Sequence, residues 1–180
     1  MVMGKRVTMH DGDNQGSNAL LMKWLGASAL VILLDQLSKL WISSHFAYGE
    51  GYVVSSVLNF VLLHNTGASF NLLSNVGGWQ RWLFSGIAIV ASVWIVWLLR
   101  KHPQRKLFCV ALVFILGGAL GNLIDRLAYG YVVDFIAFHW EEHHFAVFNL
   151  ADSAINLGAA LLLLDSFKNK PEKNDGSATS

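Results

Sequence analysis

Residues 117–152 read GGALGNLIDRLAYGYVVDFIAFHWEEHHFAVFNLAD, and this stretch joins two apolar runs through a segment that contains ionisable groups. A charged side chain at or near hydrocarbon depth costs at least about 2.5–3.5 kcal/mol, so it needs a counter-ion, a wet cavity or a function. We therefore expect a functional site in this stretch. Its candidate residues are Asp125, Arg126, Asp134 and Asp152.

The composition is that of an integral membrane protein. Of the 180 residues, 54% are hydrophobic, only 14% are charged and seven are Trp, which does not suit a small soluble domain. The net charge of +1, without a stripe of Lys and Arg, provides no basic surface for a nucleic acid. The single cysteine, Cys109, excludes an internal disulfide and any multi-cysteine metal site.

Four apolar runs predict a membrane all-α fold. Residues 82–99, for example, contain no charge and reach roughly 27 Å at about 1.5 Å per residue. Gly117 and Gly121 have the GxxxG spacing of a close helix–helix contact. Asp35 and Lys39 are four residues apart, which predicts an ion pair on one helix face. We predict transmembrane helices at about 20–43, 81–99, 107–127 and 150–167.

The remaining segments predict a small cap and two tails. Residues 52–63 are rich in β-branched and aromatic side chains, which favours a strand or hairpin at the membrane surface. The apolar stretch that ends at Trp79 predicts a short interfacial helix. We expect residues 19–168 to form the membrane domain, residues 44–80 and 128–149 to form an outer cap, and residues 1–18 and 169–180 to be disordered.

The distribution of positive charge predicts the orientation. Lys and Arg precede the first apolar run, separate the second from the third and follow the fourth, whereas residues 44–80 and 127–149 contain neither. Cytoplasmic segments carry an excess of these residues. Both termini are therefore expected in the cytoplasm, with Asp134 and Asp152 near the outer surface.

Among the possible catalytic groups in this sequence, a pair of Asp carboxylates is the best candidate. Two carboxyl groups about 3 Å apart share one proton, so that one can activate water while the other polarises a carbonyl group. Spacing alone does not decide which two of Asp125, Asp134 and Asp152 meet. Asp125 is the weaker candidate because Arg126 beside it is a ready counter-ion.

Two pairs of polar residues have structural explanations beside the functional one. Asn149 and Asp152 resemble a capping box at the start of the fourth helix, which is as good an explanation as catalysis. Asn122 and Arg126 lie on one helix face and donate either into the same cavity or to a neighbouring helix.

A histidine-rich segment raises the question of a metal site. Residues 139–144 read HWEEHH, in which Trp140 occupies the position that a zinc-binding HExxH motif gives to Glu. His139 and His143 are four apart and could bind a metal on a helix. A solvated outer loop is the prediction that we prefer, with no metal.

The segments GGALGNLIDR, VVDF and FNLADS, preceded by HNTGASF at residues 64–70, resemble the lipoprotein signal peptidase (signal peptidase II) family over about residues 30–167. The resemblance implies an aspartic endopeptidase of the bacterial inner membrane, without a cofactor, that has a β-cradle and an interfacial helix at about 53–76. Such an enzyme removes the signal peptide from diacylglyceryl-modified prolipoproteins immediately before the lipidated cysteine.

The resemblance also assigns residues. The catalytic dyad of the family carries over onto Asp134 and Asp152. The positions that match substrate-binding residues are Asn65, Gly67, Asn122, Arg126 and Asn149, together with Asp35 and Lys39 as the polar pair of the first helix. We expect a monomer whose partners are lipidated precursors and membrane lipids.

Two other functions are compatible with the same charges. In a small transporter or channel, Asp35, Lys39, Asp125 and Arg126 would form an ion or proton relay. A non-catalytic lipid-binding or assembly subunit would use none of the aspartates chemically. Flux without a cleavage product would identify the first, and silent Asp substitutions would identify the second.

Overall fold

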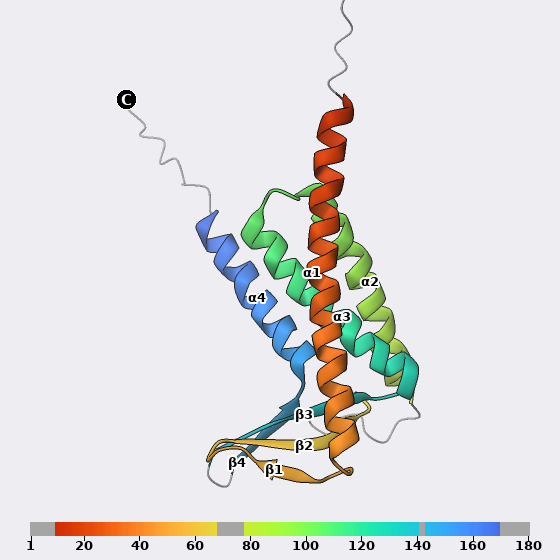
Figure 1. Cartoon of the computed structure of the whole chain (residues 1–180), viewed down its shortest axis with the longest axis vertical. Helices are drawn as coiled ribbons and strands as arrows, with labels where there is room; N and C mark the ends of the chain where they lie inside the picture. Colours follow the sequence, from red (N-terminus) through yellow and green to blue (C-terminus); the bar gives the residue numbers. More distant parts are fainter. Residues whose placement is uncertain (1–9, 68–77, 141–142, 170–180) are drawn as a thin grey trace, which may run out of the picture.

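Four helices and a four-stranded sheet make up the computed structural model, which describes residues 10–67, 78–140 and 143–169 (Figure 1). All four helices are long and apolar enough to cross a membrane. In chain order the elements are α1 (His10–His45), β1 (Gly51–Val53), β2 (Leu58–Asn65), α2 (Trp79–Lys101), α3 (Lys106–Tyr129), β3 (Val132–Trp140), β4 (His143–Phe148) and α4 (Leu150–Lys168).

Helix α3 is the centre of the bundle. It packs against α1, α2 and α4, and it is the most buried of the four spans. A Cβ atom at Gly117 would stand 2.5 Å from the Cβ atom of Val31, so glycine is required where α1 crosses α3. The packing seam predicted from the GxxxG spacing is confirmed. The buried apolar core of the bundle consists of Leu21, Ile95, Leu99, Cys109, Leu112 and Leu116.

Large apolar side chains cover the outside of the bundle. Val90 and Trp94 of α2 are 70% and 62% exposed, and Leu163 of α4 is 63% exposed. Contiguous apolar surface of this extent marks contact with a membrane or a partner. The outer surface of the helices is therefore suited to lipid.

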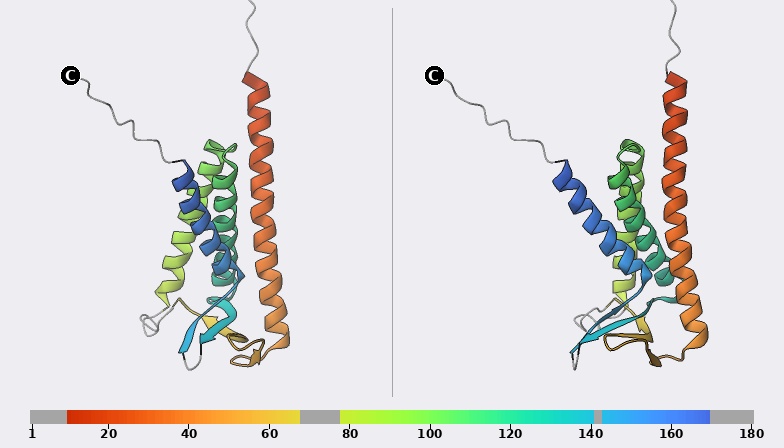
Figure 2. Two further views of the ribbon diagram at one scale, coloured as in Figure 1. Left: turned by 90° about the vertical axis from the view of Figure 1, so that its left-hand side faces the viewer. Right: turned by 60° about the vertical axis from the view of Figure 1, so that its left-hand side comes forward.

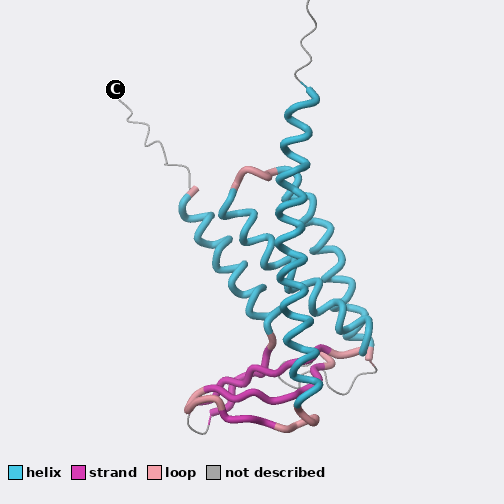
Figure 3. Tube along the Cα trace, in the orientation of Figure 1, coloured by secondary structure: helices cyan, strands magenta, loops and turns pink. Residues whose placement is uncertain are grey.

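The sheet lies at one end of the bundle, opposite the start of α1 and the end of α4 (Figures 2 and 3). Its strands are antiparallel in the order β1-β2-β3-β4, and Leu63 of β2 pairs with Asp134 of β3. A second buried cluster, formed by Ile42, Leu62, Val133 and Phe135, joins the end of α1 to the sheet. This joint determines where Asp134 lies relative to the helices.

Most elements lie where the sequence predicts them. The four spans are confirmed, and β1 and β2 confirm the strand or hairpin predicted at 52–63. The prediction of disorder is wrong for residues 10–18, because α1 begins at His10. A helix that is already nucleated extends by one backbone hydrogen bond per residue, so a polar segment can continue it.

The outer connection between α3 and α4 also differs from its prediction. Residues 128–149 are predicted as part of the outer cap, with a solvated loop at 139–144, but β3 and β4 form an antiparallel pair that includes residues of this segment. Because β3 also pairs with β2, which lies about 70 residues away in the chain, a local pattern did not reveal it. The predicted interfacial helix falls on residues 68–77, and the outer parts of the predicted tails on 1–9 and 170–180; all lie outside the described residues.

Candidate active site

A polar pocket of about 380 Å³ lies where the helices meet the sheet, and both Asp134 and Asp152 line it. It receives residues from three helices and three strands. The lining consists of Asn65, Gly67, Phe84, Asn122, Arg126, Val132, Asp134, Val147, Phe148, Asp152, Ile155 and Asn156.

Asp134 is a nearly buried carboxyl group on β3, with an exposed fraction of 2%. Asn65 Nδ2 donates to its Oδ2 at 2.8 Å, and Asn149 Nδ2 donates to its Oδ1 at 2.7 Å. Burial raises the pKa of Asp134 to about 6; the hydrogen bond from Asn65 opposes this shift and the nearby charge of Asp152 adds to it. The carboxyl group therefore exchanges its proton close to neutral pH, as a general acid or base must.

Asp152 reaches the pocket from the first turn of α4. Its backbone N–H donates to Asn149 Oδ1 at 2.9 Å, and its own Oδ2 accepts from the Asn149 backbone N–H at 3.4 Å. The predicted capping box is confirmed. The second carboxylate oxygen, Oδ1, accepts from Asn122 Nδ2 at 2.8 Å. Asp152 thus caps its helix and lines the pocket at once, so the two explanations are not exclusive.

A continuous chain of side-chain amides joins the two carboxylates. Asn149 Nδ2 donates both to Asp134 and to Asn122 Oδ1, the latter at 3.1 Å, and Asn122 in turn donates to Asp152. Asn149 Oδ1 accepts a hydrogen bond from the Asp152 backbone N–H, which fixes the orientation of the Asn149 amide. Lys39 Nζ donates to Asn122 Oδ1 at 3.0 Å and fixes the orientation of the second amide. Each carboxylate therefore accepts a hydrogen bond from an amide NH₂ group whose orientation is fixed by a second hydrogen bond to the oxygen of the same amide.

Asn65 and Gly67 form the turn on the other side of Asp134. The Gly67 backbone N–H donates to Asn65 Oδ1 at 2.9 Å, which turns the amide nitrogen of Asn65 toward Asp134. Gly67 has a φ of +111°, and a Cβ atom there would stand 3.0 Å from the ring of Phe84. Only glycine combines this backbone conformation with this contact.

Arg126 lies in the pocket wall. Its guanidinium carbon is 5.4 Å from the centre of the Phe84 ring, and Nη1 donates to the Asn122 carbonyl at 3.4 Å. Asp125 pairs with Lys39 at 2.9 Å, and not with Arg126, the counter-ion beside it in the sequence. Neighbouring residues of a helix point to different faces, so Arg126 faces the pocket while Asp125 faces α1.

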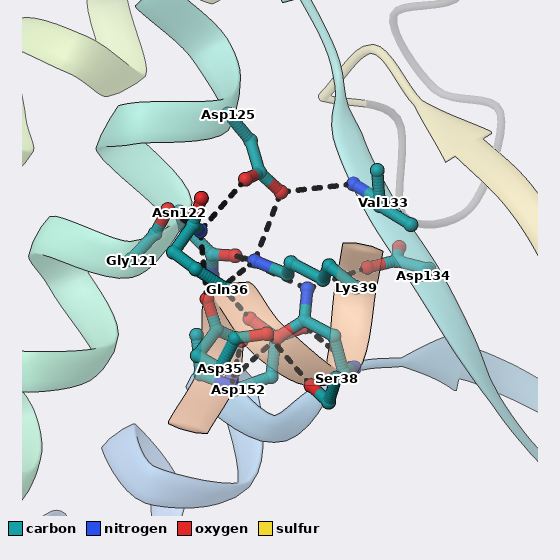
Figure 4. A network of polar contacts seen from close by, with 12 residues as sticks. Asp35, Gln36, Ser38, Lys39, Gly121, Asn122, Asp125, Val133, Asp134 and Asp152 are labelled. Atoms are coloured by element: carbon teal, nitrogen blue, oxygen red, sulfur yellow. Dashed lines mark hydrogen bonds and ion pairs between the residues drawn. The ribbon is translucent and has the colours of Figure 1, made fainter. Parts of the chain in front are cut away.

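Asp35, Lys39 and Asn149 lie behind the lining of the pocket. The Asp35–Lys39 ion pair predicted from their spacing is confirmed at 2.8 Å. Lys39 and Asp125 border a second cavity of about 330 Å³, which is distinct from the pocket that holds Asp134. Three of the expected substrate-binding residues therefore support other groups of the protein: Asp35 and Lys39, which Figure 4 shows, and Asn149.

The residues of this region that sequence analysis missed include Gln36, Phe84 and Asn156. Gln36 Nε2 donates to Asp125 Oδ1 at 2.9 Å and to Asp35 Oδ2 at 3.2 Å, and Phe84 and Asn156 line the pocket. Asn156 follows Asp152 by four residues on a helix, which is the spacing that places two side chains on one face. Gln36 had a weaker signal, as a polar residue beside Asp35 inside an apolar run.

The histidines do not have the geometry on which the metal hypothesis depended. His139 belongs to β3 and His143 to β4, so their separation of four residues is not a helical one. In the part of the chain that the structure describes, no group of three or more His, Cys, Asp or Glu residues could hold a metal ion.

Comparison with known proteins identifies the family. A family model described as Signal peptidase (SPase) II matches residues 27–168. The chain belongs to the signal peptidase II family. The family indicates a peptidase, and the four apolar helices make this chain a multi-pass membrane protein.

Individual relatives agree with this assignment. A lipoprotein signal peptidase of Paraburkholderia phytofirmans is 51% identical over 152 residues, which cover 84% of this chain and 88% of the relative. One of Ralstonia nicotianae is 50% identical over 157 residues, covering 87% and 91%. A solved bacterial membrane enzyme is 28% identical and superposes with a TM-score of 0.73, covering 87% of this chain and 94% of that one.

Proposed function

We propose that this peptidase is an aspartic endopeptidase that removes signal peptides from diacylglyceryl-modified prolipoproteins, cutting immediately before the lipidated cysteine. One observation carries the mechanism: Asp134 and Asp152 come from separate elements, line one pocket and are joined by the amides of Asn149 and Asn122. The substrate class is supported by the relatives, which are named lipoprotein signal peptidases.

The two carboxyl groups share one proton and hold one water molecule. The ionised carboxylate takes a proton from the water, whose oxygen attacks the scissile carbonyl carbon. The protonated carboxyl group donates to the carbonyl oxygen and stabilises the tetrahedral intermediate. As the intermediate collapses and the C–N bond breaks, the carboxyl group that took the proton from water gives it to the leaving amine, and the proton on the former carbonyl oxygen returns to the other carboxylate. The raised pKa of Asp134 supports it as the carrier of the shared proton in the free enzyme.

The pocket also suits the substrate on either side of the scissile bond. Its apolar part accepts the last residues of a signal peptide, while Arg126 and Asn156 offer donors to the peptide carbonyl groups. The apolar residues of the pocket are Phe84, Val132, Val147, Phe148 and Ile155. The signal helix approaches laterally from the bilayer, and the diacylglyceryl chains stay in lipid.

The distribution of Lys and Arg also gives the orientation of the protein in the membrane. The end of the bundle opposite the sheet carries the Lys and Arg residues of the connection between α2 and α3. That end lies in the cytoplasm with both termini, and the pocket lies near the periplasmic face of the inner membrane. The peptidase acts as a monomer, because both carboxylates and their donors come from one chain.

Substitution of each carboxylate tests the mechanism. Asp134→Asn and Asp152→Asn should each lower cleavage of a lipidated precursor in detergent by at least about 10³-fold, because each removes one member of a unit. Glu50→Gln is the matched control, since Glu50 is an exposed carboxylate on the same side of the bundle and outside the pocket. It should cleave at the wild-type rate.

The same assay separates the alternatives. A chelator should not affect cleavage, since no step uses a metal. Substantial turnover by either Asn variant would overturn the aspartic mechanism, and solute flux without a cleavage product would favour the transporter.

A further inference from the structure

Asp125 holds the backbone immediately before Asp134. Its Oδ2 accepts a hydrogen bond from the Val133 backbone N–H at 3.1 Å. Asp125 itself is fixed in α3 and is 1% exposed. The position of β3 along its own axis is therefore tied to α3 one residue before the catalytic carboxyl group.

Asp35 makes the equivalent contact with the segment before Asp152. Its Oδ1 accepts from the Ala151 backbone N–H at 2.9 Å, and Asp35 is 0% exposed. Ala151 N–H is one of the free donors at the start of α4, so a carboxylate from α1 completes the capping of that helix. Each catalytic aspartate is thus preceded by a residue whose N–H a buried carboxylate accepts.

Lys39 links these two carboxylates (Figure 4). Its Nζ lies 2.8 Å from Asp35 Oδ2 and 2.9 Å from Asp125 Oδ2. Gln36 Nε2 bridges the same two side chains from the preceding turn of α1, and it also donates to the Gly121 carbonyl at 3.1 Å. We call Asp35, Gln36, Lys39 and Asp125 the clamp.

Stability does not explain the clamp. Burying an ion costs several kcal/mol after relaxation, and a buried ion pair is often no more stable than apolar residues of the same volume. The neighbouring helix is nevertheless shaped to admit it: a Cβ atom at Gly121 would stand 2.5 Å from Asp35 Oδ2. The close approach of α1 and α3 at Gly121 therefore leaves room for the Asp35 carboxylate in this one position.

We propose that Asp35, Lys39 and Asp125 are positioning residues that set the separation of the two catalytic carboxylates, by tying the backbone before each of them to one ammonium group. This inference rests on the aspartic mechanism proposed above. A displacement of about 1 Å between reacting groups can cost 10²-fold in rate. Because Asp35 and Lys39 do not line the pocket of Asp134, the clamp acts on kcat and leaves substrate binding unchanged.

Truncation of either carboxylate tests the proposal. Asp35→Leu and Asp125→Leu remove the oxygen that accepts from the backbone, and each should lower kcat by about 10²-fold with KM within about twofold. Asp35→Asn and Asp125→Asn keep an acceptor oxygen of nearly the same position. They should raise kcat to about tenfold below the wild-type value, because the backbone acceptor is kept while the charge that Lys39 pairs with is lost.

Asp165→Leu is the matched control. Asp165 is buried and pairs with Arg105 at the opposite end of the bundle. Its loss should lower the thermal stability of the peptidase in detergent, less than in the clamp variants because Arg105 is partly exposed, with kcat unchanged. The comparison separates an effect on the site from an effect on the fold.

The outcomes decide as follows. The proposal would be overturned if folded leucine variants keep kcat within about threefold of the wild-type value, or if only their KM rises. If the leucine variants do not fold, the amide variants decide: a fall in kcat at unchanged KM supports the clamp, and wild-type kcat in both contradicts it. Failure of the proposed function is distinguishable, because it requires activity in Asp134→Asn or Asp152→Asn.

Discussion

The two ends of the helix bundle differ in the charges that they bury. At the sheet end, α1 and α3 bury Asp35, Lys39 and Asp125 behind the pocket. Toward the far end, α2 and α3 bury apolar side chains such as Leu99 and Leu112. The ionic contact there, between Arg105 and Asp165, is partly open to solvent, because Arg105 is 45% exposed.

This difference assigns the stability of the bundle to its far end and the geometry of the site to its sheet end. Lipid tails are as apolar as Leu, so the apolar side chains at the far end stabilise the bundle through van der Waals packing. Buried charges contribute little net stability, but they hold groups in a defined geometry. Mutations at the far end should therefore change the free energy of unfolding, and mutations at the sheet end should change the rate.

Replacement of Asn149 should have the largest effect on rate among the neutral side chains. Asn149→Ala removes the donor shared by Asp134 and Asn122, and kcat should fall by about 10²–10³-fold, as when one preorganised donor is lost. It also removes the cap of α4, which costs about 1 kcal/mol. Cleavage kinetics and thermal unfolding in detergent measure the two effects.

Asn149→Ser separates those effects. Serine is a good N-cap but is too short to reach both Asp134 and Asn122. It should recover stability without recovering kcat. Recovery of both would mean that Asn149 matters only as a cap.

Leu99→Ala tests the far end. Leu99 is fully buried in the apolar core, so the substitution should lower the free energy of unfolding by about 2–5 kcal/mol. The kcat per folded molecule should stay at the wild-type value. A fall in kcat of tenfold or more in the folded variant would show that the two ends are not separable.

The smallest predicted effect is a pH dependence of stability. Burial raises the pKa of Asp134 from 3.8 to about 6, so the folded protein binds this proton more tightly than the unfolded chain. Its stabilising contribution is present at low pH and is lost as the pH rises through 6, amounting to about 1 kcal/mol between pH 5 and 7. Thermal unfolding of the wild type at the two pH values measures it.

Asp134→Asn is the control for that measurement. Burial lowers the pKa of His64, which contributes with the opposite sign and is present in both proteins. The difference in pH dependence between the two proteins therefore reports Asp134 together with the groups coupled to it. Identical slopes would mean that the carboxyl group titrates normally in the fold.

The sequence predicts the features that depend on local patterns. Apolar length gives the four spans, a spacing of four gives the Asp35–Lys39 pair, and the residues at the start of α4 give the capping box. The choice of Asp134 and Asp152 as the proposed catalytic dyad comes only from the family resemblance. Spacing alone leaves Asp125 as a third candidate, and the structure shows it paired with Lys39 instead.

The features that the sequence does not predict depend on contacts distant in the chain. Asp125 lies next to Arg126 in sequence, but its partner, Lys39, comes from another helix. The pairing of β3 with β2 joins strands on opposite sides of two spans. No local propensity encodes either contact, because each exists only when the bundle has assembled.

The most direct test of the account is a double-mutant cycle on the dyad. Cleavage of one lipidated precursor is measured for Asp134→Asn, Asp152→Asn and the double variant, with folding verified for each. If the two carboxylates act as one unit, the double variant is no slower than either single variant. If the two losses multiply instead, the carboxylates act independently and the shared-proton mechanism is contradicted.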